Sequence, residues 1–208
     1  MKILCFILLL SFGENLFAVG LILNQPMSHL SERLRRDSAL IRASIIGEID
    51  EVRDLREQGG DINARGNNGI TPLIGATEKG HENIVKYLLE QKCDVDACTI
   101  QDKFTALLLA SLKNHGNIAK LLVDHGADVN WENTEGHSSL IFAVNNNNPS
   151  LVRSLVLNGA NICHESRDGS TPISVALNCY KTANGPDKAS RRKMIDLLIN
   201  LFEGTFIR

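Results

Sequence analysis

Histidine is the side chain best suited to carry protons or bind metals at neutral pH, and the histidines of this chain are scattered. Five of the six histidines are His81, His115, His125, His137 and His164, and none of these is spaced to converge with the others as catalytic groups or zinc ligands. The sequence also contains no glycine-rich phosphate loop, GxSxG elbow or HExxH helix. It therefore predicts no catalytic, cofactor or metal site, and no enzyme.

Composition describes a folded chain without a nucleic-acid signature. Its 208 residues are 43% hydrophobic and 22% charged, which is enough to bury a core. The 22 Lys and Arg against 24 Asp and Glu give a net charge of -2, too little positive field to capture a phosphate backbone. Aromatic residues make up 5%, so small and aliphatic side chains must fill the core. We expect closely stacked helices and no nucleic-acid partner.

The N-terminal residues differ from the rest of the chain. Lys2 precedes an apolar run over residues 3–12, which is shorter than the roughly 20 residues of a membrane-spanning helix. Polar residues 13–15 interrupt the run before residues 16–23 resume it. This pattern predicts a signal peptide over residues 1–20 and export to a periplasm or out of the cell, with no stable membrane insertion after cleavage. The alternative is an uncleaved segment that tethers the protein to a membrane.

Two markers recur along the chain with a fixed period. A leucine-like position repeats in steps of 33 or 34 residues, at Leu40, Leu73, Leu107, Leu140 and Ile173. A second marker, typified by Ala127-Asp128-Val129-Asn130, has its Asp or Asn 21 residues after each of the first four of these positions. Such a constant spacing predicts an array of identical structural repeats.

Each repeat is predicted to form two short helices. A Thr or Ser before the leucine position can cap a helix, and Pro72 stands where a missing N–H costs nothing. We expect a first helix over residues 72–79, a turn at Gly80-His81 and a second helix over residues 82–91 with one apolar face. The polar stretch after the second marker is typical of an extended turn that projects away from the helices.

These motifs resemble the ankyrin repeat family. The family pattern is visible in Thr71-Pro72-Leu73, Gly80-His81, the apolar residues 85–89 and residues 126–130. The resemblance covers residues 37–204 and implies an all-α ankyrin repeat solenoid of about five helix-turn-helix-hairpin units. The repeats are predicted at about 37–69, 70–103, 104–136, 137–169 and 170–204, within a domain of residues 37–208. Residues 21–36 form a linker or an extension of the N-terminal cap.

The chain departs from the family pattern at several positions. The family's His after Thr-Pro-Leu is replaced in every repeat, by Ile74, Leu108, Ile141 and Ser174. The fifth repeat carries an insert at about residues 181–191, where Gly, Pro and charged residues predict a surface loop between the two helices. This loop is either a contact site or a tolerated insertion.

Cysteine usage does not indicate a metal site. Apart from Cys5, which cleavage would remove, the chain has Cys93, Cys98, Cys163 and Cys179, with no CxxC pair. In an oxidising compartment only Cys93 and Cys98 are placed by the repeat alignment to form a disulfide. The alternative is that these residues are free thiols packed in the stack.

The resemblance implies that partner contacts come from the hairpin tips and the exposed ends of the first helices, on one long concave surface. The first hairpin tip and the first helix that follows it contribute Arg65, Asn67, Asn68, Ile70, Glu78 and Lys79. The second tip and the helix after it contribute Gln101, Asp102, Phe104, Leu112 and Lys113. The third tip and the helix after it contribute Trp131, Glu132, Thr134, Glu135, His137, Asn145 and Asn146, and the fourth tip contributes Glu165, Arg167, Asp168 and Ser170.

Phe104 and Trp131 stand out among these residues because aromatic side chains amid polar ones are typical of interface centres. The alternative for each is that it folds over the neighbouring repeat. The sequence predicts a monomer that binds a protein partner through the concave surface, and it does not identify that partner. A second reading is an accessory or regulatory subunit of an enzyme encoded elsewhere, or a weak enzyme, acting through the 181–191 insert.

Overall fold

The structure is a computed structural model that describes residues 27–206. The chain divides into two compact parts, residues 1–36 and residues 37–208. Residues 27–36 form the start of helix α3, Met27–Ile46, and the remainder of that helix belongs to the second part. The predicted signal peptide lies outside the described residues.

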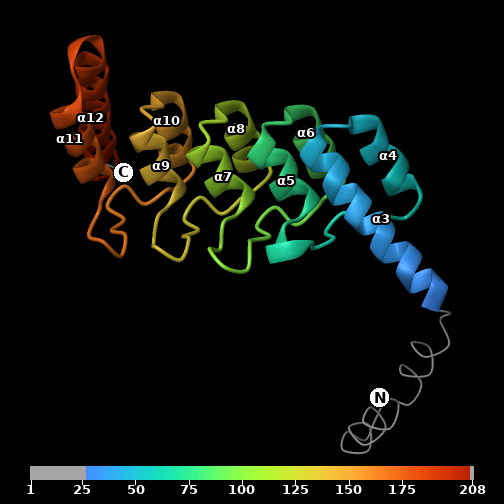
Figure 1. The fold of residues 1–208 in the computed structure, drawn as a ribbon. Helices are drawn as coiled ribbons and strands as arrows, with labels where there is room; N and C mark the ends of the chain where they lie inside the picture. The colour runs from blue at the N-terminus through green and yellow to red at the C-terminus, as the bar shows by residue number, and fades with distance from the viewer. Residues whose placement is uncertain (1–26, 207–208) are drawn as a thin grey trace, which may run out of the picture. The chain divides into compact units, whose positions relative to one another are not determined.

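The second part consists of helix pairs stacked in chain order (Figure 1). In the described residues there are ten α-helices, one 3-10 turn η1 (Asn67–Gly69) and no strand longer than an isolated bridge. The pairs are α3 with α4 (Ile49–Glu57), α5 (Pro72–Lys79) with α6 (Glu82–Glu90), α7 (Ala106–Leu112) with α8 (Gly116–Asp124), α9 (Ser139–Asn145) with α10 (Pro149–Leu157), and α11 (Pro172–Thr182) with α12 (Gly185–Phe206). The predicted all-α ankyrin solenoid is confirmed.

The first helices begin at the predicted caps. The hydroxyl oxygen of Thr71 accepts the N–H of Ile74 at 3.2 Å, and that of Thr105 accepts the N–H of Leu108 at 3.3 Å. Each bond satisfies one of the backbone donors that a helix start leaves without an intrahelical acceptor. Ser138 makes no such bond, so the third of these helices starts without side-chain capping.

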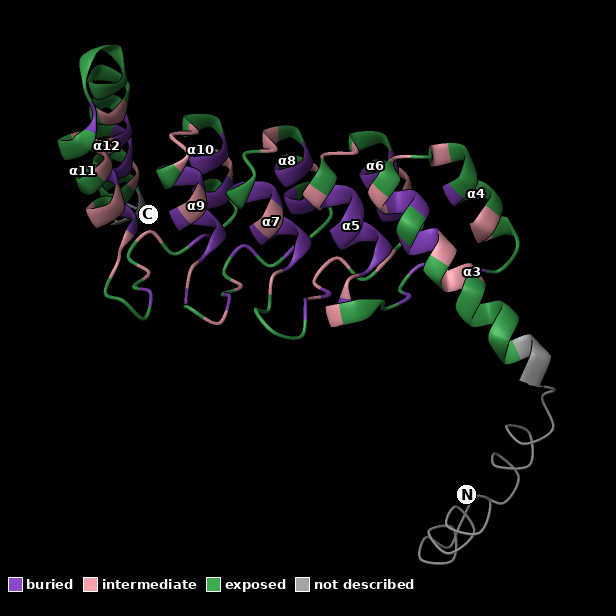
Figure 2. Cartoon of the chain, viewed as in Figure 1, coloured by how far each residue is buried: buried purple, intermediate pink, exposed green. Residues whose placement is uncertain are grey.

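The core runs through all repeats, with one row of buried residues from the first helices and one from the second helices. Buried stretches, purple in Figure 2, accordingly appear in the helix pairs along the whole stack. Small residues on the first helices let neighbouring helices approach closely, as the composition indicates. The alanines of that row, Ala43, Ala76, Ala110 and Ala143, are completely buried. Burying one leucine-sized side chain stabilises the fold by about 1.5–3 kcal/mol, so the stack is stabilised mainly along these rows.

Histidines at the turns join consecutive repeats. The Nε2 atom of His81 lies 2.9 Å from the carbonyl oxygen of Ile45, and its ring lies against Gly47, where a Cβ would come within 2.6 Å of it. The His115 ring lies against Gly80 in the same way, since a Cβ at Gly80 would come within 3.0 Å of it. These two histidines are therefore structural connectors.

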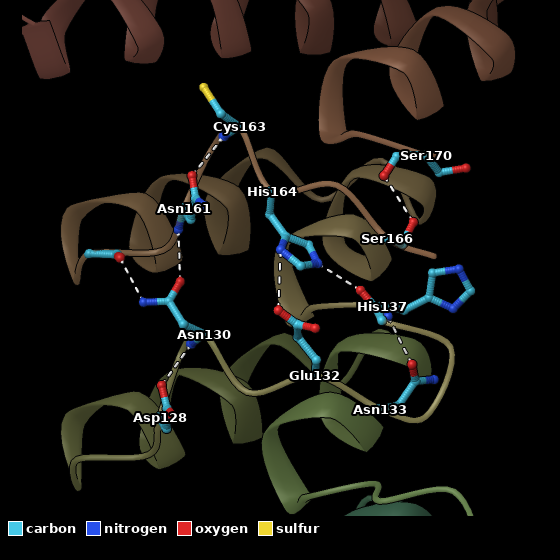
Figure 3. Close-up of polar contacts among 12 residues, drawn as sticks. Asp128, Asn130, Glu132, Asn133, His137, Asn161, Cys163, His164, Ser166 and Ser170 are labelled. Atoms are coloured by element: carbon cyan, nitrogen blue, oxygen red, sulfur yellow. Dashed lines mark hydrogen bonds and ion pairs between the residues drawn. The ribbon is translucent and has the colours of Figure 1, made fainter. Parts of the chain in front are cut away.

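A second set of connections runs along the opposite ends of the helices. Within the first repeat, the N–H of Asp61 donates to the side chain of Asp37 at 2.8 Å. Between repeats, a side-chain oxygen of one repeat accepts a backbone N–H of the next repeat in three cases, and we call this set the acceptor ladder. Its donor and acceptor pairs are Asp94 to Asn63, Asp128 to Asp96 and Asn161 to Asn130, at 2.8, 2.9 and 2.8 Å. Figure 3 shows the last of these bonds.

The predicted surface loop over residues 181–191 is wrong. Helix α11 continues to Thr182 and α12 begins at Gly185, so most of the insert is helical. Its Lys, Ala and Arg residues are good helix formers, which outweighs the Gly-Pro signal once that dipeptide stands at the start of α12. The guanidinium of Arg191 donates to the carbonyl oxygen of Asn145 at 2.6 Å, which attaches the insert to the fourth repeat.

Candidate protein-binding surface

Each hairpin tip is closed by its own backbone hydrogen bond. We use the word tip for residues 64–71, 97–105, 131–138 and 164–171, which connect one repeat to the next. The closing bonds run from the N–H of Gly66 to Ile70, of Thr99 to Phe104, of Asn133 to His137 and of Ser166 to Ser170, at 2.9, 3.0, 3.2 and 2.9 Å. The tips are therefore defined turns.

Backbone hydrogen bonds also join consecutive tips. The N–H of Ile100 donates to the carbonyl oxygen of Asn68 at 2.9 Å. The N–H groups of Thr134 and Arg167 donate to Asp102 and Glu135 of the preceding tips, each at 3.1 Å. We call this arrangement the tip row. Because the backbone of each tip is fixed by its neighbours, little ordering cost remains for a partner to meet.

None of the predicted contact residues is buried. The exposed ones are Arg65, Asn67, Lys79, Gln101, Asp102, Leu112, Lys113, Glu132, Glu135, Asn145, Glu165, Arg167 and Asp168. The half-buried ones are Asn68, Ile70, Glu78, Phe104, Trp131, Thr134, His137, Asn146 and Ser170. The residues thus lie on one edge of the stack and on the adjoining ends of the first helices.

Phe104 belongs to an aromatic row that crosses two repeats. Its ring is stacked on that of Phe142 with centroids 6.2 Å apart, and His137 meets Phe142 edge-on at 5.6 Å. Phe142 was not among the predicted contact residues. Its position two residues after the leucine marker, equivalent to Gly75 and Leu109, is a signal that could have found it.

Trp131 is bound to the tip before its own. Its indole Nε1–H donates to the carbonyl oxygen of Lys103 at 3.0 Å, and the residue is half-buried. The ring thereby satisfies a backbone acceptor of the neighbouring repeat. This geometry agrees with the alternative that Trp131 folds over its neighbour.

The last two tips, residues 131–138 and 164–171, share a polar cluster (Figure 3). His164 lies between Glu132, at 3.4 Å from Nδ1, and the carbonyl oxygen of Gly136, at 2.6 Å from Nε2. In the last tip Asp168 accepts the N–H of Ser170 at 2.9 Å and the hydroxyl of Ser166 at 2.8 Å. These bonds, that from the Ser170 backbone foremost, hold the pKa of Asp168 below its ordinary value.

The first-helix ends add an apolar element next to the tips. Leu112 is 37% exposed at the end of α7, and Lys113 follows it. The amide of Asn146 donates to the carbonyl oxygens of Ser111 and Leu112 at 2.8 and 2.9 Å, which fixes this end of α7. Ile100, 70% exposed at a tip, is a further apolar residue that sequence reasoning missed.

The four cysteines of the described residues are separate thiols. Cys93, Cys98, Cys163 and Cys179 are free thiols, so the possible Cys93–Cys98 bond is not formed. Burial raises the pKa of Cys93 to about 11, which leaves its nucleophilic thiolate scarce at neutral pH. Within the part of the chain that the structure describes, no group of three or more His, Cys, Asp or Glu is arranged to hold a metal ion.

The fold and the tip row together define a helical repeat protein. A family model described as ankyrin repeats in three copies matches the chain over residues 7–99, 40–133, 91–166 and 107–184. These matches cover more than half of the chain, so the chain belongs to the ankyrin repeat family. Such repeats imply a protein–protein interaction module, and proteins of the family are generally non-enzymatic scaffolds.

Curated relatives match shorter stretches. Alpha-latrocrustotoxin-Lt1a of Latrodectus tredecimguttatus is 38% identical over 68 residues, which is 32% of this chain and 5% of the toxin. Ankyrin repeat domain-containing protein 40 of Mus musculus is 34% identical over 83 residues, or 39% of this chain and 23% of that protein. The Homo sapiens protein of the same name is 32% identical over 83 residues, with the same coverage. The chain therefore spans less than a quarter of the length of these relatives.

Across residues 27–206, no helix combines the length and the apolar character that crossing a membrane requires.

Proposed function

We propose that this ankyrin repeat protein binds a folded protein partner through the tip row and the adjoining first-helix ends. The observation that carries the proposal is the pair of backbone bond sets that fix the tips, which leave exposed side chains such as Asn67, Gln101 and Glu165 directed outward from a rigid frame. A preformed surface of this kind binds without a large loss of conformational entropy.

The chemistry of the surface suggests what the partner presents. In the second and third repeats it includes the exposed apolar side chains Ile100 and Leu112, and Phe104 of the third repeat is stacked on Phe142. The last two tips carry Glu132, Glu135, Glu165 and Asp168 against Arg167 alone. We infer a partner surface with an apolar centre and basic residues toward the fifth repeat, because complementary charges steer association and fix register.

A pair of matched double variants tests this proposal. Leu112→Asp with Lys113→Glu changes the first-helix end, and Leu157→Asp with Lys120→Glu makes the same substitutions at exposed sites on the second helices. The partner retained by the native chain from its source compartment is expected to be lost by the first variant and kept by the second. Loss of a central apolar anchor lowers affinity by roughly 30-fold or more.

Folding of both variants is checked by thermal unfolding followed by circular dichroism. If both variants melt as the native chain does and both retain the partner, the contact lies elsewhere and the proposed surface is wrong. If the control variant alone loses the partner, the outer face of the second helices is the binding surface.

We further propose that binding takes place in a periplasm or outside the cell, after removal of residues 1–20. The support is the sequence pattern at the N-terminus. A fusion of residues 1–20 to a phosphatase that is active only in an oxidising compartment should be active, and the mass of the exported chain should reveal the cleavage site. Activity that stays with membranes, with no shortened chain, would instead favour tethering by the uncleaved segment.

The alternative role, an accessory or regulatory subunit acting through residues 181–191, has less support. The insert is mostly helical, and Arg191 and Ser190 in it are bonded to Asn145 and Asn147 of the fourth repeat. These bonds use the insert to stiffen the stack. A deletion of residues 183–190 that abolishes partner binding without altering the melting temperature would revive this alternative.

A further inference from the structure

The outer face of the fifth repeat is apolar at positions that are buried in the inner repeats. At the leucine marker of the first helix, Leu73, Leu107 and Leu140 are each 1% exposed, whereas Ile173 is 36% exposed. In the inner repeats these side chains are covered by the helices of the next pair.

The second helices show the same contrast. Leu89, Val123 and Val156 are 5%, 7% and 8% exposed, whereas their counterpart Ile199 on α12 is 45% exposed. Leu177, on α11, is 41% exposed. A repeat at the end of a soluble stack usually carries polar residues on this face. Retained apolar residues therefore indicate that something covers it.

A groove of about 430 Å³ lies on this face. It is lined by Ile162, Cys163, Ile173, Leu198, Ile199 and Phe202, with Glu203 at its edge. The lining is mostly aliphatic, so the groove suits hydrophobic side chains of a protein and offers little to a polar ligand.

The charges along α12 suit the same face of a second copy. Lys188, Arg192, Ile195, Ile199 and Glu203 follow one another at intervals of three or four residues, so they form one stripe of the helix. The stripe is basic at its start, where Lys193 adds a further positive charge, and acidic at its end. When two such helices lie antiparallel, the basic end of each meets the acidic end of the other.

We propose that the outer face of α11 and α12 binds the same face of a second copy of this chain, around a two-fold axis that sets the two α12 helices antiparallel. A two-fold contact uses one self-complementary patch on both copies. The proposal goes beyond partner binding by the tip row, and it replaces the monomer that the sequence predicts with a dimer whose two tip rows remain accessible.

The size of the face sets the expected strength. Helix α12 has 22 residues. At 1.5 Å per residue α12 is about 33 Å long, and α11, with 11 residues, is about 17 Å long. With roughly 10 Å of width for each helix, the face measures about 500 Å² per copy, or about 1,000 Å² buried in total. This value is close to the minimum for a biological interface, so we expect a dissociation constant of about ten micromolar or weaker.

Sedimentation velocity of the purified full chain, from about 1 to about 200 µM at low salt, tests the proposal. The native chain should shift from monomer to dimer over this range. Ile199→Asp should raise the dissociation constant roughly tenfold or more, whereas the control Leu157→Asp, at a more exposed position on a second helix, should leave it unchanged. A native chain that stays monomeric at the highest concentration would overturn the proposal, as would a dimer unaffected by Ile199→Asp.

Two further measurements do not depend on how Ile199→Asp folds. Lys188→Glu and Glu203→Lys should each weaken the dimer, and the double reversal should restore it, because the antiparallel arrangement brings opposite ends together. Alkylation of Cys163, followed peptide by peptide in a mass spectrometer, should slow as the dimer forms, while that of Cys98 stays constant. Protection of Cys163 that is independent of concentration would point to a cover within the same chain and would contradict the dimer.

Discussion

At the scale of single residues, Asp96 shows how a connector can cost stability. Its carboxylate accepts the N–H of Asp128 at 2.9 Å. Burial raises the pKa of Asp96 above 3.8, and the hydrogen bond from Asp128 opposes this only in part. The folded state therefore holds the proton more tightly than the unfolded chain. Stability falls as the pH rises from 3.8 through the folded pKa, and the cost is fully present at neutral pH.

Replacing Asp96 with Asn should remove this cost. Asn63 and Asn130 hold the same place in the ladder, so the amide oxygen can accept the same N–H. We expect Asp96→Asn to raise the melting temperature at pH 7, with the gain disappearing below pH 3.8, where the native carboxylate is also neutral. Thermal unfolding across pH 3 to 8 measures this, with Asp102→Asn at an exposed tip as the control. A gain that is equal at every pH would show that charge is not the cause.

At the scale of elements, the turn histidines explain why the helix pairs keep their register. Gly47 adopts φ +102°, and the His81 ring fills the space where a side chain would stand. Position 47 must therefore meet two requirements: its backbone must adopt a positive φ, and it must leave room for the His81 ring. Substitutions at positions 47 and 81 distinguish the backbone strain from the steric clash.

We expect Gly47→Ala to destabilise the fold by about 1–3 kcal/mol, through the left-handed backbone and the clash with His81. His81→Ala alone should cost about 1–2 kcal/mol, for the lost hydrogen bond and packing. The double variant should be less destabilised than the sum, because the smaller side chain removes the clash. Urea unfolding measures all three. Strict additivity would mean that the ring and the glycine do not interact.

The same elements show what the sequence could predict. The repeat period of 33 or 34 residues and the Thr-Pro pair were enough to predict α5 at residues 72–79. Helix α6 ends one residue earlier than predicted. The helical insert was missed because a Gly-Pro dipeptide starts a helix as readily as it ends one. The bonds of the tip row and the Phe104–Phe142 stack were also missed, since they join residues more than 30 positions apart through geometry that no local pattern contains.

At the scale of the whole molecule, the continuous core predicts that repeats unfold together. Trp131 is the single tryptophan of the chain and lies in the third repeat, while Leu88 is completely buried in the second repeat. Leu88→Ala should destabilise the fold by about 2–5 kcal/mol. If the core couples the repeats, the Trp131 fluorescence transition in urea should shift together with the circular dichroism signal. A fluorescence transition that stays at its native midpoint would show that the repeats unfold independently.

The acceptor ladder also bears on how the length of such a chain can change. The second and third repeats each donate one backbone N–H to the repeat before and offer one side-chain oxygen to the repeat after, so they have matching connectors at both ends. A tandem duplication of residues 104–136 in the gene would therefore add a repeat whose connections are already complete. A duplication whose length differs from a whole repeat by even a few residues would not, so inherited changes in length should occur in whole repeats.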